Sequence, residues 1–122
     1  MKKQVRRAFR ATVLGRDRYR CVTCGTPGKD RQGGDGHKSF HPDIPEDRLM
    51  PLDAHHITDR TRMPNGGYVP ENGITLCDDG CHRLAEVFHR TGTPHQGFSP
   101  AGLYARIGSP PDAARRASSE PA

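Results

Sequence analysis

The chain is short, basic and poor in the residues that build a large core. It has 122 residues, of which 32% are hydrophobic, with no Trp and a formal net charge of +5. A core this thin rarely holds a domain together without a metal or disulfides. No stretch approaches the roughly 20 apolar residues of a membrane helix, so we expect one domain and no membrane partner.

The N-terminal segment predicts a basic, amphipathic helix. Over residues 3–14, apolar side chains recur at helical spacing from Val5 to Val13, and Gly15 is placed to end the helix. Residues 1–20 hold eight Lys or Arg and one acid, which suits a polyanionic partner but is also typical of a solvated helix face. The segment has no continuous apolar run like that of a signal peptide, so we expect a cytoplasmic protein.

The middle of the chain predicts two short strands separated by loops. Residues 18–22 suggest a short strand or turn, and the Gly- and Pro-rich residues 25–50 suggest a long loop insertion. Strands are expected at 52–57 and 73–76, with a loop over 58–72. We expect His37, His41 and His95, which fall in loops, to be solvated.

Two further helices are expected towards the C-terminus. The first runs over about 80–90, with Leu84, Val87 and Phe88 facing its core. The second runs over about 99–107, capped by Ser99. We expect the folded domain to span 1–108 and the Ser-, Pro- and Ala-rich residues 109–122 to form a disordered tail.

Four cysteines occur in two closely spaced pairs, Cys21-x2-Cys24 and Cys77-x3-Cys81. Two such pairs can supply the four thiolates of a tetrahedral, structural Zn²⁺ site, and metal binding would then stabilise the fold. The alternatives are reduced buried cysteines or a disulfide formed on oxidation. His82 could also join the zinc set, but we prefer four cysteines because His82 is then free for a second metal.

The order of His, Asn, Cys and His residues in the second half resembles the HNH endonuclease family, in its zinc-bearing branch. The resemblance covers about residues 6–90, with a core motif over about 51–90. The motifs that carry it are Asp53-Ala54-His55-His56-Ile57, Gly66-Gly67, Glu71-Asn72-Gly73-Ile74-Thr75-Leu76-Cys77 and Cys81-His82-Arg83-Leu84.

The resemblance implies an α+β fold of the ββα-metal type, a β-hairpin followed by a helix with a divalent ion between them, together with the N-terminal helix and the four-cysteine zinc site. It implies that His56 is the general base, that His55 and His82 bind the catalytic ion, and that Asn72 orients the His56 segment. Mg²⁺ or another divalent ion such as Mn²⁺ or Ni²⁺ would serve. We therefore expect a DNA-cleaving hydrolase of phage, restriction or mobile-element type, with no small-molecule cofactor, as a monomer or weak dimer.

The chemistry of these residue types supports the same roles. A neutral imidazole can take a proton from water at cellular pH, and a divalent ion can stabilise charge on phosphate oxygens. Adjacent strand residues point to opposite faces, so His55 and His56 serve one site only if the strand ends or distorts there. We therefore expect an irregular backbone over 54–58.

A third ligand for the catalytic ion is open. Glu86 and His89 follow His82 at i+4 and i+7 on one helix face, and we favour His89 while keeping Glu86, or no third ligand, as alternatives. Asp53 shares a strand face with His55 and could contact a ligand residue without binding the ion itself.

Four arginines are candidates for DNA phosphate contacts: Arg60, Arg62, Arg83 and Arg90. Solvated surface arginines are the plain alternative for each. For the whole chain, the alternative to an enzyme is a zinc-stapled nucleic-acid-binding module without catalysis, and a third hypothesis is a zinc adaptor that binds proteins.

Overall fold

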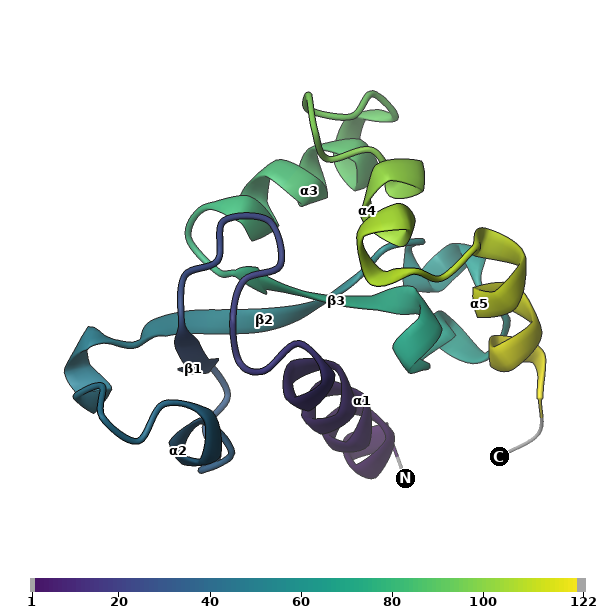
Figure 1. The fold of residues 1–122 in the computed structure, drawn as a ribbon. Helices are drawn as coiled ribbons and strands as arrows, with labels where there is room; N and C mark the ends of the chain where they lie inside the picture. The colour runs from purple at the N-terminus through teal and green to yellow at the C-terminus, as the bar shows by residue number, and fades with distance from the viewer. Residues whose placement is uncertain (1, 121–122) are drawn as a thin grey trace.

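The computed structural model describes residues 2–120, which form a mixed α+β structure, as predicted. Over these residues it contains five α-helices and one three-stranded sheet (Figure 1). The elements in chain order are α1 (Lys2–Arg16), β1 (Gly28–Asp30), α2 (His37–Phe40), β2 (Met50–His56), β3 (Gly73–Cys77), α3 (Cys81–Thr91), α4 (Pro100–Ile107) and α5 (Pro111–Ser119). Short 3-10 turns lie at Glu46–Arg48, Arg60–Arg62, Pro64–Gly67 and Pro70–Asn72.

The sheet has the order β1-β2-β3 and one partly open edge. β2 pairs antiparallel with β3 along its second half, from Leu52 opposite Cys77 to His56 opposite Gly73. β1 is parallel to β2 and ends at Asp30, opposite Leu52. Within the described chain, the edge of β2 that β1 covers is therefore left free from Asp53 onward.

Helices α1 and α3 lie on opposite faces of the sheet (Figure 1). On the α1 side, Phe9 and Val13 are buried against β3 at Gly73, where a Cβ atom would lie 2.8 Å from the Phe9 ring. A side chain at position 73 would thus push α1 away from the sheet. On the α3 side, Ala85 is the buried residue of the helix.

The face that α3 turns to the sheet is polar, which differs from the expectation. Leu84, Val87 and Phe88 were expected to face the core, but they are only partly buried. The inward face instead carries His82, Ala85, Glu86 and His89, at the i, i+3, i+4 and i+7 positions of a helix. Helix α3 therefore contacts the sheet largely through His and Glu side chains, which can bind a metal ion or transfer a proton.

Helix α4 closes the main core as predicted. Leu103 and Tyr104 are buried, and Ile107 packs against the same cluster. The Ser99 hydroxyl accepts a hydrogen bond of 3.1 Å from the Gly102 amide, which is the expected N-cap.

The segment over 25–50 was expected to be a long loop, and that expectation is wrong. It contains β1, α2 and a 3-10 turn. His37 and His41, expected in solvent, are buried, whereas His95 is exposed as predicted. The His41 Nε2 lies 2.9 Å from the Tyr19 carbonyl oxygen, so a buried hydrogen bond replaces the expected solvation.

The expectation of a disordered tail over 109–122 is also wrong for the described residues, because Pro111–Ser119 form α5. Its small residues Ala114 and Ser118 are buried, which lets the helix approach the turns over 64–72 closely. The Asn65 side chain donates to the Ser118 carbonyl at 2.8 Å. A low-hydrophobicity segment is thus ordered by a tertiary contact that composition does not report; residues 121–122 lie outside the described residues.

Across residues 2–120, no helix combines the length and the hydropathy needed to cross a bilayer.

The packing of α5 predicts that a larger side chain lowers the free energy of unfolding at a buried position of the helix but not at an exposed one. Ala114→Leu should lower the free energy of unfolding by about 1–3 kcal/mol, because Ala114 has no exposed surface and the larger side chain overpacks the interface. Arg116→Leu, on the exposed side of α5, should change it by less than about 0.5 kcal/mol. Urea unfolding of both variants measures this, and equal stabilities would mean that α5 is not docked.

Candidate metal centres and catalytic pocket

The four cysteines converge from three parts of the chain into one cluster. Their sulfur atoms all lie within 4.8 Å of one another, and Cys24 Sγ is 3.9 Å from Cys77 Sγ. A tetrahedral Zn²⁺ with Zn–S bonds of about 2.3 Å requires sulfurs about 3.8 Å apart. The cluster therefore fits a structural metal ion, and the geometry suits zinc.

The chemistry of the thiols also favours an ion. Burial, together with the neighbouring Cys21, raises the pKa of Cys81 to about 12. Burial likewise raises the pKa of Cys77. Four thiolates cannot coexist there without a compensating cation, and a divalent metal supplies that charge.

The three-residue spacing of Cys77 and Cys81 places Cys81 as the first residue of α3. The Cys81 amide donates to Cys77 Sγ at 3.3 Å, so both cysteines sit at the β3–α3 junction. His82 follows directly and points away from the sulfur cluster, towards Glu86 and Asp53. His82 is therefore separate from the four-cysteine group, as expected.

His55 and His56 lie on opposite faces of β2. His55 faces α3, with its ring centroid 5.2 Å from that of His82, while His56 stacks on Phe9 of α1 at 4.5 Å. The expected irregular backbone over 54–58 is wrong for residues 54–56, because the ladder with β3 continues regularly through His56. The strand ends there, and residues 57–58 form a bend. Alternation along a regular strand thus separates the two rings.

Both histidines nevertheless border one pocket of about 400 Å³. The pocket wraps around the free edge of β2, where β1 has already ended, so it is reached by side chains from both faces of the strand. Its lining includes His55, His56, His82, Glu86, Arg6 and Arg60. The open edge of β2 therefore lets both histidines border one pocket although the strand is regular.

His55, His82 and Glu86 form a candidate site for a second ion. Their ligand atoms lie within 4.8 Å of one another. Glu86 Oε1 is 3.0 Å from His82 Nε2 and 3.6 Å from His55 Nδ1. Metal–ligand bonds of about 2.1 Å place neighbouring ligand atoms about 3.0–3.4 Å apart, which these distances approach.

The protonation of these groups suits a cation. Both ring nitrogens of His55 are buried without a hydrogen-bond partner, and burial lowers its pKa, so the ring is a neutral ligand. The adjacent His55 and His82 imidazoles lower the pKa of Glu86, which keeps it ionised. Two imidazoles and one carboxylate leave further coordination positions open for water or phosphate.

His82 is held by carboxylates on its other nitrogen. Its Nδ1 lies 3.5 Å from both Asp53 Oδ2 and Asp78 Oδ1, and Arg31 in turn approaches the two carboxylates at 3.6 and 3.4 Å. Carboxylates behind a histidine ligand fix its tautomer and ring orientation. Although burial opposes it, Glu86 and Asp53 raise the pKa of His82. The position of Asp53 agrees with the supporting role considered for it.

His56 has the surroundings of a neutral, oriented base. Burial lowers its pKa to about 4, with Arg60 adding to the effect, so the ring is neutral at neutral pH. Phe9 stacks on it, and the Tyr68 ring meets it edge-on at 4.7 Å. Its Nε2 is buried without a hydrogen-bond partner, so a proton from water in the pocket can reach the ring only at Nδ1.

Asn72 is fully buried and holds the chain that follows His56. Its Oδ1 accepts from the Thr58 amide at 3.0 Å and from the Tyr104 hydroxyl at 2.6 Å, while its Nδ2 donates to the Thr58 and Gly67 carbonyls. The Ile57 amide donates to the Asn72 carbonyl at 2.9 Å. Asn72 is thus a tether between the two strands, in the position expected of it.

His89 lies outside the candidate ion group. Its Nε2 is 2.8 Å from the His56 carbonyl oxygen, and its ring stacks on that of His55 at 5.1 Å. The geometry therefore favours Glu86 as the third ligand, and it places His89 as a brace between α3 and the end of β2.

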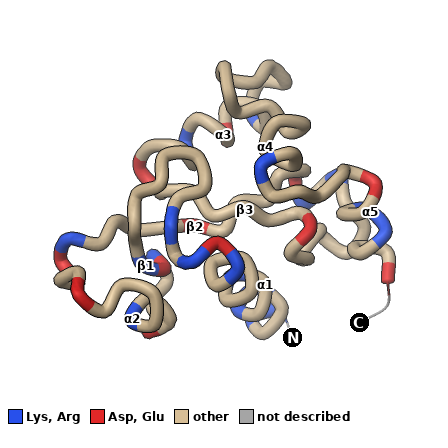
Figure 2. Tube along the Cα trace, in the orientation of Figure 1, with Lys and Arg blue, Asp and Glu red and all other residues tan. Residues whose placement is uncertain are grey.

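The predicted phosphate-binding arginines separate into two groups. Arg60 lines the pocket and contacts the Tyr68 hydroxyl at 2.9 Å. Arg62 borders a neighbouring hollow, and Arg83 and Arg90 are exposed on α3 outside the pocket lining. The positive charge nearer the site comes from α1, which carries a series of Lys and Arg (Figure 2).

Several pocket residues were missed by sequence reasoning: Arg6, Phe9, Arg31 and Tyr68. Arg6, Phe9 and Arg31 lie far from the His and Asn motifs in the chain, whereas Tyr68 lies among them, between Gly67 and Asn72. The basic, apolar pattern of residues 3–14 was visible, but nothing in it indicated that Phe9 would stack on His56.

In the comparisons with known proteins, no family model matches the chain, and neither the curated proteins nor the solved structures gave a match. The resemblance to HNH nucleases stays a prediction.

The cysteine cluster predicts that zinc content depends on sulfur and not on His82. Cys24→Ser should abolish stoichiometric zinc and lower the free energy of unfolding by several kcal/mol, because metal binding stabilises the fold. His82→Asn should retain one zinc per chain. Elemental analysis and thermal unfolding test this, and zinc retained in Cys24→Ser but lost in His82→Asn would reverse the assignment.

The ligand geometry predicts which residue of α3 binds the second ion. In the zinc-loaded protein, Glu86→Gln should weaken Mn²⁺ or Ni²⁺ binding at least roughly tenfold, since it removes a charged ligand. His89→Gln should change the affinity less than about threefold, because His89 contacts a backbone carbonyl. Isothermal titration calorimetry distinguishes them, and the opposite order of effects would restore His89 as the ligand.

Proposed function

We propose that the chain is a metal-dependent endonuclease of the HNH type, which hydrolyses a phosphodiester bond of DNA. The observation that carries this proposal is His56: a neutral imidazole that borders the same pocket as His55, His82 and Glu86. A base beside a candidate ion site is the arrangement that phosphodiester hydrolysis requires.

His56 is the general base in this proposal. Its Nδ1, the ring nitrogen that is not closed off from solvent, would accept a proton from a water molecule in the pocket. The resulting hydroxide would attack the phosphorus as the bond from phosphorus to the leaving oxygen breaks. Phe9 and Tyr68 fix the plane of the ring, and the His89 contact and the Asn72 tether hold its backbone. A base held from several sides keeps its orientation at little entropic cost.

The candidate ligands of the catalytic ion are His55, His82 and Glu86. An ion bound there supplies Lewis-acid stabilisation of the negative charge that develops on the phosphate oxygens and on the leaving oxygen. Asp53 and Asp78 hold the His82 ring on the opposite side.

Arg6 and Arg60 are the proposed phosphate contacts. Both line the pocket, one from α1 and the other from the turn after β2. Guanidinium groups bind phosphate oxygens as forked donors and position the strand without reading its sequence. We therefore expect weak sequence preference.

The second candidate function is a zinc-stapled nucleic-acid-binding module without catalysis. The basic surface of α1 and the cysteine cluster favour binding as much as they favour cleavage. Binding alone, however, gives no use for a neutral imidazole at His56 beside two imidazoles and a carboxylate that can hold an ion.

Nicking of supercoiled plasmid tests the two functions against each other. With Mg²⁺, Mn²⁺ or Ni²⁺, the wild-type protein should nick the plasmid, and His56→Ala should reduce the rate by at least 10²-fold, since general-base catalysis contributes roughly 10²–10⁴-fold. His95→Ala, at an exposed position, is the matched control and should retain the wild-type rate.

EDTA should stop the reaction in the zinc-loaded enzyme. Absence of nicking with every ion, in a protein that keeps its zinc and binds DNA, would reject the nuclease and leave the binding module.

A further inference from the structure

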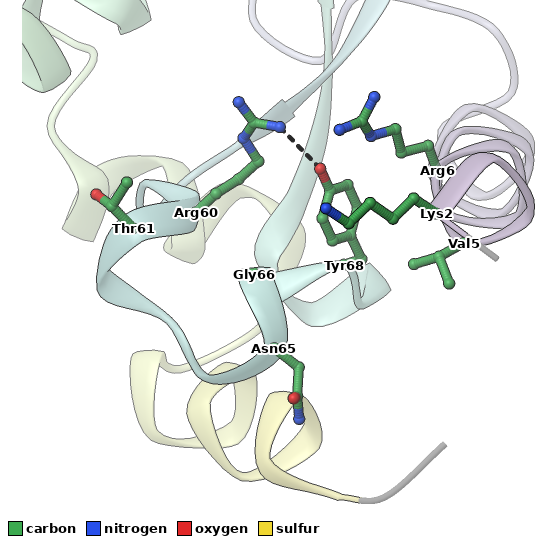
Figure 3. A pocket seen from close by; sticks show the side chains of 8 residues that line it. All are labelled: Lys2, Val5, Arg6, Arg60, Thr61, Asn65, Gly66 and Tyr68. Carbon is green, nitrogen blue, oxygen red and sulfur yellow. Dashed lines mark hydrogen bonds between the residues drawn. The ribbon is translucent and has the colours of Figure 1, made fainter.

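A second pocket adjoins the catalytic pocket on the α1 side and is not used by the chemistry above. It has a volume of about 430 Å³ and is closed by α1, by the turns after β2 and by Tyr68 (Figure 3). Arg6, Arg60 and Tyr68 line both pockets, so the two are adjacent.

The rim of this pocket is cationic. Figure 3 shows Lys2 and Arg6 reaching in from α1, with Arg60 on the other side of Tyr68. The Arg60 guanidinium donates to the Tyr68 hydroxyl at 2.9 Å. Three positive groups at one opening suit a phosphate.

The interior, by contrast, is shaped by groups without charge. Val5 lies in its wall with 41% of its surface exposed. Gly66 lies opposite, in a left-handed conformation with φ of 78°, and a Cβ atom there would come within 2.9 Å of the Tyr68 ring. A bare backbone, a valine and an aromatic ring form a surface for a flat, uncharged group.

We propose that this pocket binds one unpaired nucleotide of the DNA, next to the phosphate that is cleaved. The nucleotide's phosphate would lie between Arg6 and Arg60, and its base would lie against Val5 and Tyr68. This inference rests on the proposed function for its substrate. It adds a preference for DNA in which a nucleotide has left the stack.

The preference follows from the energetics of unstacking. A base inside a duplex is stacked and paired, and moving it into a pocket costs free energy that is smallest when the base is already unpaired. Aromatic side chains bind any base through its π face, so the pocket would select for structure and not for sequence. Bulges, flaps and gaps are therefore the expected preferred substrates.

Binding can be tested without catalysis. The zinc-loaded full chain, labelled with ¹³C and ¹⁵N, is titrated with thymidine 5′-monophosphate or with 2-deoxyribose 5-phosphate. Both should shift the Arg6 and Arg60 side-chain resonances, and the nucleotide alone should shift the Val5 methyls and the Tyr68 ring. Identical shifts with both compounds, or unmoved Val5 methyls, would overturn the nucleotide pocket in favour of a phosphate site only or of another occupant.

Cleavage tests the preference itself. The wild-type protein should cut a duplex with one unpaired thymidine about fivefold faster or more than the fully paired duplex, the lower end of what one base–aromatic stack contributes. Val5→Glu should bring this ratio close to one. Ala11→Glu adds the same charge at an exposed position of α1 outside the pocket lining, and it should leave the ratio unchanged.

The ratio of the two cleavage rates distinguishes a role of Tyr68 in the pocket from a purely structural role. Tyr68→Leu disturbs His56 and should slow both substrates, but it should also reduce the ratio, whereas Tyr68→Phe should largely keep the ratio. Cleavage of both duplexes at one rate by the wild type would overturn this proposal and leave the nuclease intact. No cleavage of either duplex would reject the nuclease, and the nucleotide titration would still decide whether the pocket binds a nucleotide.

Discussion

The convergence of four cysteines at the β3–α3 junction is the constraint on which the rest of the structure depends. Cys21 and Cys24 come from the turn after α1, Cys77 ends β3 and Cys81 begins α3. A metal ion bound by these sulfurs would join the turn after α1 and the end of β3 to the start of α3, the helix that carries His82 and Glu86. His82 is the next residue after Cys81, so its position depends on that junction. With few apolar residues available, such a bond would also supply stability that the core alone does not.

The second organising feature is the early end of β1. A third strand that ran further would cover the edge of β2 beyond Asp53 and separate the environments of His55 and His56 completely. Because β1 stops at Asp30, a regular strand places one imidazole on each face and both beside one pocket. The proposed base and the proposed ion ligands thus have different surroundings. His56 is enclosed by aromatic rings of α1 and the loop, and His55 by the polar face of α3.

Helix α1 combines two roles in this arrangement. Its apolar face covers the sheet and stacks Phe9 on His56, and its basic face contributes Arg6 to both pockets. Under the proposed function, the same helix would orient the base and hold the substrate. Because both pockets lie beside Tyr68, a substrate in the second pocket would lie close to His56, the proposed general base.

The sequence by itself determined the cysteine pairs, the strands around His55 and Asn72, and the helices on which His82 and Leu103 lie, because these depend on local spacing and on short-range capping. Helical spacing places Glu86 and His89 on one face of α3. Only the tertiary structure decided that a Glu86 oxygen joins His55 and His82 in the candidate ion group, while His89 Nε2 contacts the His56 carbonyl. The tertiary structure likewise decided that α5 is ordered and that Arg6, Phe9, Arg31 and Tyr68 reach the pocket. Contacts between residues distant in the chain depend on how helices and strands pack. A local pattern of polar and apolar residues does not predict that packing.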